Sequence, residues 1–336
     1  MNRRTFLTTS TACCALSASA SVAQAQPGPR FAEAAAYSAD RGGVGFVVSR
    51  HGLVLAEDYP NGGGVHTRWP IGAGTRIFAP LLAATLASQN LLSLDDPAAS
   101  VLWEWTSHPV KATISIRALL NGTSGLAFPV DAPQNLDAAL ALEPAEAPGL
   151  RFADDAASYI LLAEIAHRRL QLAGKDPDPA RYLTTQVLGE IGCVPIAWTR
   201  WPSGAPRLDD GVAVSTRAWT CAGELMRREG VWRGQQLADD QVLREAQRGS
   251  FAESRAGFGL WLAAPANSRA RAPLDSDLWR AASPAPIDLA MAAGANGARL
   301  YFSGTEGLVV ARQGGSASVW SDAEFLSLIW RGLGQP

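Results

Sequence analysis

Short apolar runs bounded by polar or glycine-rich turns predict β-strands at both ends of the chain. Residues 44–49 and 53–57 form one such pair, and Arg-His-Gly at 50–52 predicts the turn of a hairpin between them. Near the C-terminus, glycine-rich turns separate three more runs, at residues 287–292, 298–303 and 308–312. Both ends of the chain are therefore expected to contribute strands.

Between these ends, apolar residues recur at the spacing of α-helices. The stretch 75–88 predicts a buried helix that Pro80 kinks or starts late, because proline cannot donate a backbone hydrogen bond. Ser321 followed by Glu324 predicts a capping box at the start of a last helix. The remaining helices are predicted at residues 31–38, 155–172, 179–191, 215–228 and 322–331.

This order of elements predicts a mixed α/β (α+β) fold. An antiparallel sheet built from both termini and flanked by helices would enclose an inserted, mostly helical region. We assign residues 26–70 and 285–336 to a sheet-plus-helix subdomain and residues 71–284 to a mostly helical subdomain. A length of 336 residues suits one large domain or two that share an interface, so we expect the two subdomains to form one unit.

The first 25 residues have the features of a targeting signal rather than of a folded segment. Arg3 and Arg4 form a twin-arginine pair, a mild Ala/Ser/Thr stretch follows, and Ala-Gln-Ala at 23–25 is a cleavage motif. We therefore expect a Tat-type signal peptide that is removed after this motif, and a periplasmic mature protein. A lipoprotein anchor at Cys13 or Cys14 is the rival interpretation, but it requires an apolar run that the preceding residues do not supply.

Composition and charge narrow the class of partner. A formal charge of −2, with 47% hydrophobic and 18% charged residues, indicates a globular protein without the basic surface that nucleic acids require, so a small molecule is the expected partner. No segment after the signal peptide is long and apolar enough to span a bilayer. Cys193 and Cys221 remain after cleavage, and the sequence leaves open whether they form a disulfide or stay separate thiols.

The sequence lacks the residue patterns that are typical of metal sites and of nucleotide-binding loops. The histidines are scattered, and Glu164-x-x-His167 is the one pair at helical ligand spacing, which on its own is typical of a solvated helix face. Gly-Ala-Gly at 72–74 precedes a helix as in a dinucleotide loop, but Ile77 occupies the position of the third glycine. We therefore expect no cofactor and no metal.

Five segments follow one another in an order that a known family shares. They read Trp-Pro-Ile-Gly-Ala-Gly-Thr-Arg at 69–76, Leu-Leu-Ser-Leu-Asp-Asp-Pro at 91–97, Leu-Leu-Asn-Gly-Thr-Ser-Gly-Leu at 119–126, Pro-Gly-Leu-Arg-Phe at 148–152 and Gly-Ala-Asn-Gly-Ala-Arg-Leu-Tyr-Phe at 294–302. The chain thereby resembles the serine β-lactamase and penicillin-binding-protein superfamily, and most of all its esterase and amidase branch. The resemblance implies a β-lactamase/transpeptidase-like fold across nearly the whole mature chain.

The resemblance also implies a Ser-x-x-Lys motif at the start of the first buried helix, where the serine is the nucleophile and the lysine helps to take its proton. In this chain the slot reads Ala-Gly-Thr-Arg at 73–76. Ala73 has no nucleophilic atom, and Arg76 keeps its proton at physiological pH. The chain contains two lysines, Lys111 and Lys175, and neither stands three residues after a serine, so the motif is not displaced elsewhere.

The second and third motifs of the family are altered in the same way. The resemblance implies a Tyr or Ser followed two residues later by Asn at 154–156, where this chain has Asp-Asp-Ala. It implies a Lys or His two residues before Gly294, where this chain has Ala292. All three motifs have therefore lost their reactive side chains.

Two interpretations of Asp154 and Asp155 are open. The two residues are either an N-cap and a first-turn acid of the following helix, or Asp154 faces Arg76 across the old active-site cleft and forms an ion pair with it. In the second case we expect Arg76, Asp154 and Gly294 to belong to a vestigial binding cleft that has no catalytic residue.

Three functions are compatible with these residues. The first is an exported, non-catalytic relative that binds a small anionic or peptide-like ligand. The second is a hydrolase of a small ester or amide, in which Asp154 or Asp155 activates a water molecule while Arg76 stabilises the oxyanion. The third is a scaffold that docks another envelope protein. The replacement of every reactive residue favours the first.

Overall fold

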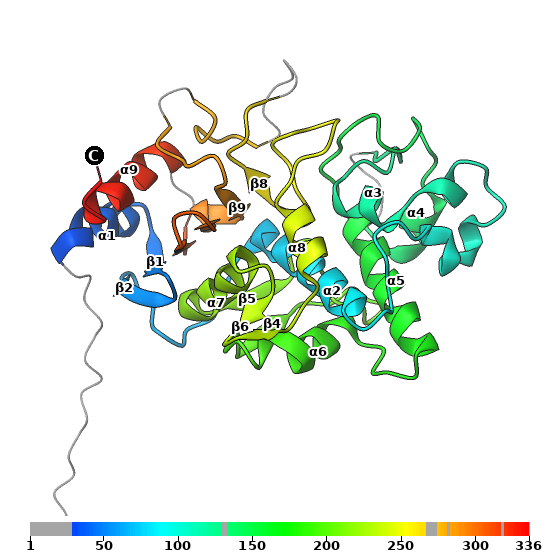
Figure 1. Ribbon diagram of the computed structural model, residues 1–336, viewed down its shortest axis with the longest axis horizontal. Coiled ribbons are helices and arrows are strands. Elements are labelled where there is room, and N and C mark those ends of the chain that lie inside the picture. The colour runs from blue at the N-terminus through cyan, green and yellow to red at the C-terminus, as the bar shows by residue number, and fades with distance from the viewer. Residues whose placement is uncertain (1–28, 130–133, 267–273, 281–282, 317–318, 336) are drawn as a thin grey trace, which may run out of the picture.

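A computed structural model describes residues 29–129, 134–266, 274–280, 283–316 and 319–335 of the chain (Figure 1). The predicted signal peptide, residues 1–25, lies outside the described residues. Within the described ranges, the helices are too short or too polar to cross a bilayer.

One six-stranded antiparallel sheet joins the two ends of the chain. Its strand order is β2-β1-β11-β10-β9-β8, so the N-terminal hairpin pairs directly with the last strand of the chain. The strands are β1 (Gly43–Arg50), β2 (Leu53–Asp58), β8 (Trp261–Leu262), β9 (Ala290–Ala293), β10 (Arg299–Ser303) and β11 (Leu308–Gly314). The predicted antiparallel sheet from both termini is therefore confirmed, together with its five predicted strands.

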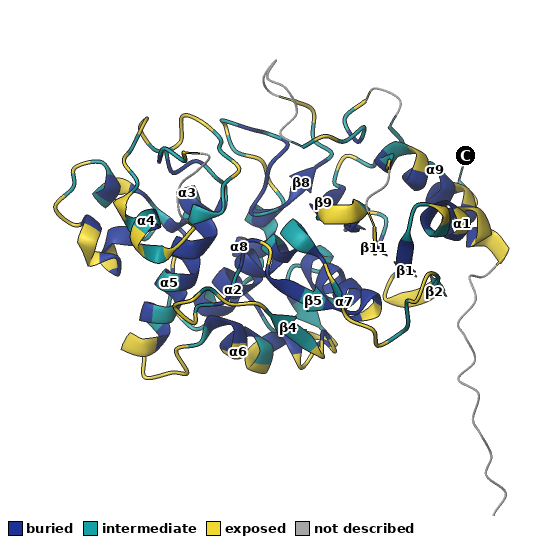
Figure 2. Ribbon diagram, turned by 180° about the vertical axis from the view of Figure 1, so that it is seen from behind, coloured by how far each residue is buried: buried dark blue, intermediate teal, exposed yellow. Residues whose placement is uncertain are grey.

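Two layers of helices cover this sheet, one on each face. Helices α1 (Ala32–Asp40) and α9 (Asp322–Gly332) pack together on one face, and α7 (Thr216–Arg227) packs against β1, β10 and β11 on the other (Figure 1). Strand β10 shows the alternation that this arrangement requires, because Leu300 and Phe302 belong to one apolar cluster and Tyr301 to the other. Figure 2 shows the central strands as buried and β2, at the sheet edge, as largely exposed.

The remaining elements are short and mostly helical. The helices are α2 (Phe78–Ala87), α3 (Ile116–Leu120), α4 (Leu136–Ala141), α5 (Ala157–Leu172), α6 (Pro179–Leu183) and α8 (Asp240–Ala246). A small sheet has the order β3 (Trp69–Pro70), β5 (Val212–Val214) and β4 (Ile196–Trp198), and β6 (Val231–Trp232) pairs with β7 (Gln235–Gln236). Single turns of 3₁₀-helix lie at Pro29–Phe31, Ala98–Ser100, Trp103–Trp105, Lys111–Thr113 and Ala295–Gly297, with a longer one at Gly72–Ile77.

The predicted helix at 75–88 begins late, as Pro80 indicated. The segment Gly72–Ile77 is 3₁₀-helical and α2 starts at Phe78, which places Pro80 in the first turn, where a backbone N–H has no helical partner to lose. The predicted helix at 179–191 is shorter than expected, because α6 ends at Leu183 and a π-helical turn, Thr184–Leu188, follows it.

Half of the predicted capping box at α9 forms. The Ser321 hydroxyl accepts a hydrogen bond from the Glu324 backbone N–H at 3.0 Å, as predicted. The reciprocal bond from Glu324 is replaced, because the Ser321 backbone N–H donates to the Tyr37 hydroxyl at 3.2 Å. Tyr37 belongs to α1, so the cap of the last helix is completed by the first.

Candidate functional site

A small cavity of about 70 Å³ lies where the helical region meets the edge of the large sheet. The 3₁₀ segment before α2 contributes Ala73 and Arg76, the segment before α5 contributes Asp154, the first turn of α5 contributes Ser158, and β9 contributes Ala293. We call this cavity the cleft. It brings together residues of the first two altered motifs, and from the third only Ala293, which lies between Ala292 and Gly294.

Arg76 and Asp154 form an ion pair in the cleft, through Nη1 of the arginine and Oδ1 of the aspartate. The Arg76 guanidinium also lies over the Tyr159 ring, 4.9 Å from its centroid. Burial lowers the pKa of Arg76, but Tyr159 and Asp154 raise it by more, so the pKa lies above its ordinary value. The predicted pairing of Arg76 with Asp154 is therefore confirmed.

The pair leaves hydrogen-bonding capacity unused. Arg76 Nε is buried and has no hydrogen-bond partner among the residues that the structure describes. The side chain of Asp154 is 38% exposed, against 15% for Arg76, so the carboxylate is the more accessible half of the pair. Buried donors without partners are rare in folded proteins, because each costs the free energy of its lost hydration.

Asp155 has a different role from its neighbour. Its Oδ1 accepts from the Ser158 backbone N–H at 2.6 Å, and its Oδ2 accepts from the Ser158 hydroxyl at 3.1 Å. Burial raises the pKa of Asp155 to about 7, although the two bonds from Ser158 oppose this shift. Asp155 therefore accepts from the first turn of α5 but precedes its N-cap residue, Ala156, so the first interpretation, an N-cap and a first-turn acid, is wrong in detail, while Asp154 forms the ion pair of the second.

The turn that precedes α2 presents no side-chain oxygen to the cleft. Ala73 contributes a methyl group to the lining. Thr75 is fully buried, and its hydroxyl accepts from the Val212 backbone N–H at 3.0 Å, on the far side of the turn. A nucleophile would therefore have to come from another element.

Gly294 lies beside the cleft lining rather than in it. A Cβ at this position would overlap the carbonyl oxygen of Ile71, so glycine allows the end of β9 to touch the backbone just before Ala73. Ala292 is fully buried among the apolar residues between sheet and helices, whereas Ala293 reaches the cleft.

The β-lactamase family model matches residues 29–311 of this sequence. The chain belongs to the beta-lactamase family. Among curated proteins no sequence matches it.

Solved structures share this β-lactamase fold at low sequence identity. The chain is similar to a family VIII carboxylesterase, with a TM-score of 0.70 and 14% identity over 93% of this chain and 99% of the other. It is also similar to a beta-lactamase/D-alanine carboxypeptidase from Pseudomonas syringae, with a TM-score of 0.66 and 16% identity over 91% and 98%. A penicillin-binding protein homologue from Caulobacter crescentus gives a TM-score of 0.66 and 15% identity over 92% and 98%.

Sequence reasoning missed several residues of this β-lactamase-family cleft. Ser158 and Tyr159 line it from the first turn of α5, and Trp261 lines it from β8. The Ser158 hydroxyl is detectable in principle, because it stands three residues after Asp155, the spacing of a capped helix start. Trp261 is not, because its strand is two residues long and pairs with β9 only in the folded sheet.

The two cysteines and the Glu164–His167 pair, whose spacing could suit metal ligands, do not line the cleft. Cys193 and Cys221 are free thiols in the structure, and burial raises the pKa of Cys193 well above its ordinary value. Glu164 Oε1 accepts from Arg168 Nε at 2.5 Å, and His167 Nδ1 donates to the Pro177 carbonyl at 2.9 Å. Across the described ranges, no three His, Cys, Asp or Glu side chains gather as metal ligands would.

Proposed function

We propose that this β-lactamase-family protein is a non-catalytic relative that binds a small anionic or peptide-like ligand in the cleft. The observation that carries the proposal is the pair of Arg76 and Asp154 beside the methyl group of Ala73. A hydroxyl and an amine are needed at these positions for acylation in the family, and a methyl group and a guanidinium perform neither task.

The groups that remain suit recognition of an amide or a carboxylate. The Arg76 guanidinium lines the cavity and can donate to a carboxylate or carbonyl oxygen of a ligand. A ligand N–H can donate to the exposed carboxylate of Asp154. Because the cavity measures about 70 Å³, it suits one such group of a ligand rather than a whole drug-sized molecule.

Two probes test this proposal by showing whether the protein reacts covalently or binds reversibly. We expect no mass increase when the purified protein is incubated with a fluorophosphonate or with benzylpenicillin, and we expect ligand-observed NMR to detect reversible binding of benzylpenicillin. Arg76→Met should abolish that binding, whereas Arg50→Met, which breaks a pair with Glu306 outside the cleft, should retain it. A stoichiometric adduct, or binding that both variants retain, contradicts the proposal.

One observation favours hydrolysis of an ester or amide as a second candidate function. The Ser158 hydroxyl lies in the cleft and donates to Asp155, whose pKa of about 7 suits a general base. Here Asp155 would take the proton from Ser158 or from a water molecule, and Arg76 would stabilise the oxyanion. A fluorophosphonate adduct mapped to Ser158, and lost in Asp155→Asn, supports this candidate and excludes the first.

We also propose that the chain is exported through the twin-arginine route to the periplasm. The support is the sequence of residues 1–25. Replacing both Arg3 and Arg4 with Lys should leave unprocessed precursor in the cytoplasm, which immunoblots of cell fractions would detect. An unchanged periplasmic yield contradicts the assignment.

A further inference from the structure

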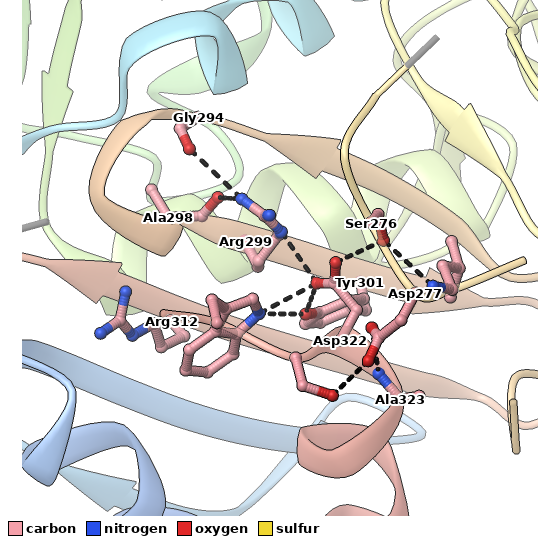
Figure 3. Close-up of polar contacts among 12 residues, drawn as sticks. Ser276, Asp277, Gly294, Ala298, Arg299, Tyr301, Arg312, Asp322 and Ala323 are labelled. Atoms are coloured by element: carbon pink, nitrogen blue, oxygen red, sulfur yellow. Dashed lines mark hydrogen bonds and ion pairs between the residues drawn. The ribbon is translucent and has the colours of Figure 1, made fainter. Parts of the chain in front are cut away.

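A buried carboxylate at the start of α9 gathers four donors from different parts of the chain. Asp322 is 1% exposed, and its Oδ1 accepts from Arg299 Nε at 2.8 Å, from Trp320 Nε1 at 3.0 Å and from the Tyr301 hydroxyl (Figure 3). Its Oδ2 accepts from the Ser276 hydroxyl. Burial raises the pKa of Asp322, but Arg299 and these donors lower it by more, so the carboxylate stays ionised.

Through Arg299, this carboxylate holds the turn between β9 and β10. Arg299 Nη1 donates to the carbonyl of Gly294 at 3.2 Å and to that of Ala298 at 3.0 Å, the two residues that flank the turn (Figure 3). The backbone of Gly294 in turn touches Ile71 and Gly74, on either side of Ala73. The β9–β10 turn, which forms the first wall of the cleft, is therefore supported by Asp322 through Arg299.

Through Ser276, the same carboxylate holds the segment 274–280. Asp277 reinforces this anchor, because it accepts from the Ser321 hydroxyl and from the Ala323 backbone N–H at 3.0 Å. Leu274 lines the cleft. Trp279 Nε1 donates to the Leu262 carbonyl at 2.7 Å, and its ring lies edge-on to Trp261, 6.4 Å between centroids. This segment forms a second wall of the cleft.

We propose that Asp322 is a positioning residue that fixes both walls of the cleft relative to each other. The proposal treats the cleft as the ligand site, as the proposed function does. Each oxygen of the carboxylate serves one wall: Oδ1 holds Arg299 and the β9–β10 turn, and Oδ2 holds Ser276 and the segment 274–280. Ligand affinity should therefore depend on a group that lies outside the cleft.

The donor pattern shows which hydrogen bond an amide at this position would lose. All four partners donate to Asp322, so the NH₂ group of an asparagine must face one of them. Three donors converge on Oδ1, which leaves the Oδ2 side for the NH₂ group. There it meets the Ser276 hydroxyl, which accepts from the Leu278 backbone N–H at 3.1 Å and would have to accept from the NH₂ group too, so that its own proton loses residue 322 as an acceptor. Asp322→Asn should therefore weaken the hold on the segment 274–280 first.

Hydrogen exchange of the ligand-free protein tests the positioning directly, so its result stands even if no ligand binds. In Asp322→Asn we expect amides of residues 274–280 to exchange about tenfold faster or more, while those of β1 and β11 keep their rates. Ser276→Ala should reproduce this effect at 274–280 alone, and Arg299→Lys should affect residues 294–298 instead.

The matched control is Asp288→Asn. Asp288 accepts from Ser303 and Thr305 at the opposite end of β10, so the same chemical change is made on the same sheet away from the cleft. For a second readout, the Kd of benzylpenicillin should rise about tenfold in Asp322→Asn and stay unchanged in Asp288→Asn. Faster exchange throughout the sheet, unchanged exchange at 274–280, or an equal loss of affinity in the control overturns the proposal. Covalent labelling of the cleft instead overturns only the proposed function.

Discussion

Arg76 and Arg299 each pair with an aspartate, but the first pair lies in the wall of a cavity and the second lies between the large sheet and α9. Asp322 is 1% exposed and receives hydrogen bonds from Trp320, Tyr301 and Ser276 besides Arg299. The Asp154 side chain is 38% exposed, and Arg76 retains a buried Nε without a partner in the described structure.

By this difference, the Arg299–Asp322 pair stabilises the fold, whereas the Arg76–Asp154 pair has groups that a ligand could contact. A buried pair whose hydrogen-bonding groups are all satisfied has nothing left to offer a ligand, and removing one partner leaves the other charge buried alone. A pair with an unused donor at a cavity wall can exchange part of its contacts for a ligand at lower cost. The contrast yields four predictions.

The largest effect is expected for Asp322→Ala. Arg299 is 7% exposed, and this change leaves its guanidinium buried without a carboxylate. The free energy of unfolding should therefore fall by about 3–5 kcal/mol. Urea denaturation followed by tryptophan fluorescence measures this loss. Asp154→Ala is the comparison variant and should lose much less, because water can replace its carboxylate. Equal losses in the two variants would remove the distinction between the pairs.

The two pairs also differ in how far the sequence could predict them. The strands of both ends were predictable from apolar runs and turn residues, and the pairing of Arg76 with Asp154 was one of two interpretations that the sequence left open. The Arg299–Asp322 pair carries no such pattern, because its members come from a strand and a helix that meet only in the folded sheet. Ser276 and Trp279 stand in a segment with no regular structure, so periodicity is silent about their contacts.

The pH dependence of stability should differ in sign between Asp155 in the cleft and Asp322, which with its four donors at the start of α9 forms what we call the α9 network. The pKa of Asp155 is about 7 in the folded protein and near 3.8 when unfolded, so its contribution to stability is full at acidic pH and is lost as the pH rises from about 4 through 7. Asp155→Asn should therefore gain stability relative to the unaltered protein by about 4 kcal/mol between pH 4 and pH 8.

The α9 network supplies the opposite slope. The pKa of Asp322 is lowered, so its stabilising contribution is present above its unfolded pKa of 3.8 and is lost as the pH falls. Thermal unfolding of Asp155→Asn and Asp322→Asn across the same pH series measures both trends. Parallel profiles for the two variants would contradict the assigned protonation states.

A smaller effect is expected for the interaction between Arg76 and Asp154. A double-mutant cycle with Arg76→Met and Asp154→Asn should give a coupling energy of about 1 kcal/mol or less, because partly exposed pairs are screened by water. The same cycle on Arg299 and Asp322 serves as the reference and should give a larger value. A coupling at Arg76 and Asp154 that equals the reference would mean that the cleft pair is a structural element.

The smallest effect is expected when the family's first motif is restored. Ala73→Ser with Arg76→Lys supplies a hydroxyl and an amine, but Asp154 remains beside the new amine and favours its protonated form, which cannot take the hydroxyl proton. Groups that act as one catalytic unit are strongly non-additive, so the pair of substitutions should give at most slow acylation by p-nitrophenyl acetate and no steady turnover. Adding Asp154→Tyr removes the opposing carboxylate and should raise the acylation rate by about tenfold. Absorbance at the start of the reaction separates an acylation burst from turnover. Equal rates with and without Asp154→Tyr would show that Asp154 does not control the charge at position 76.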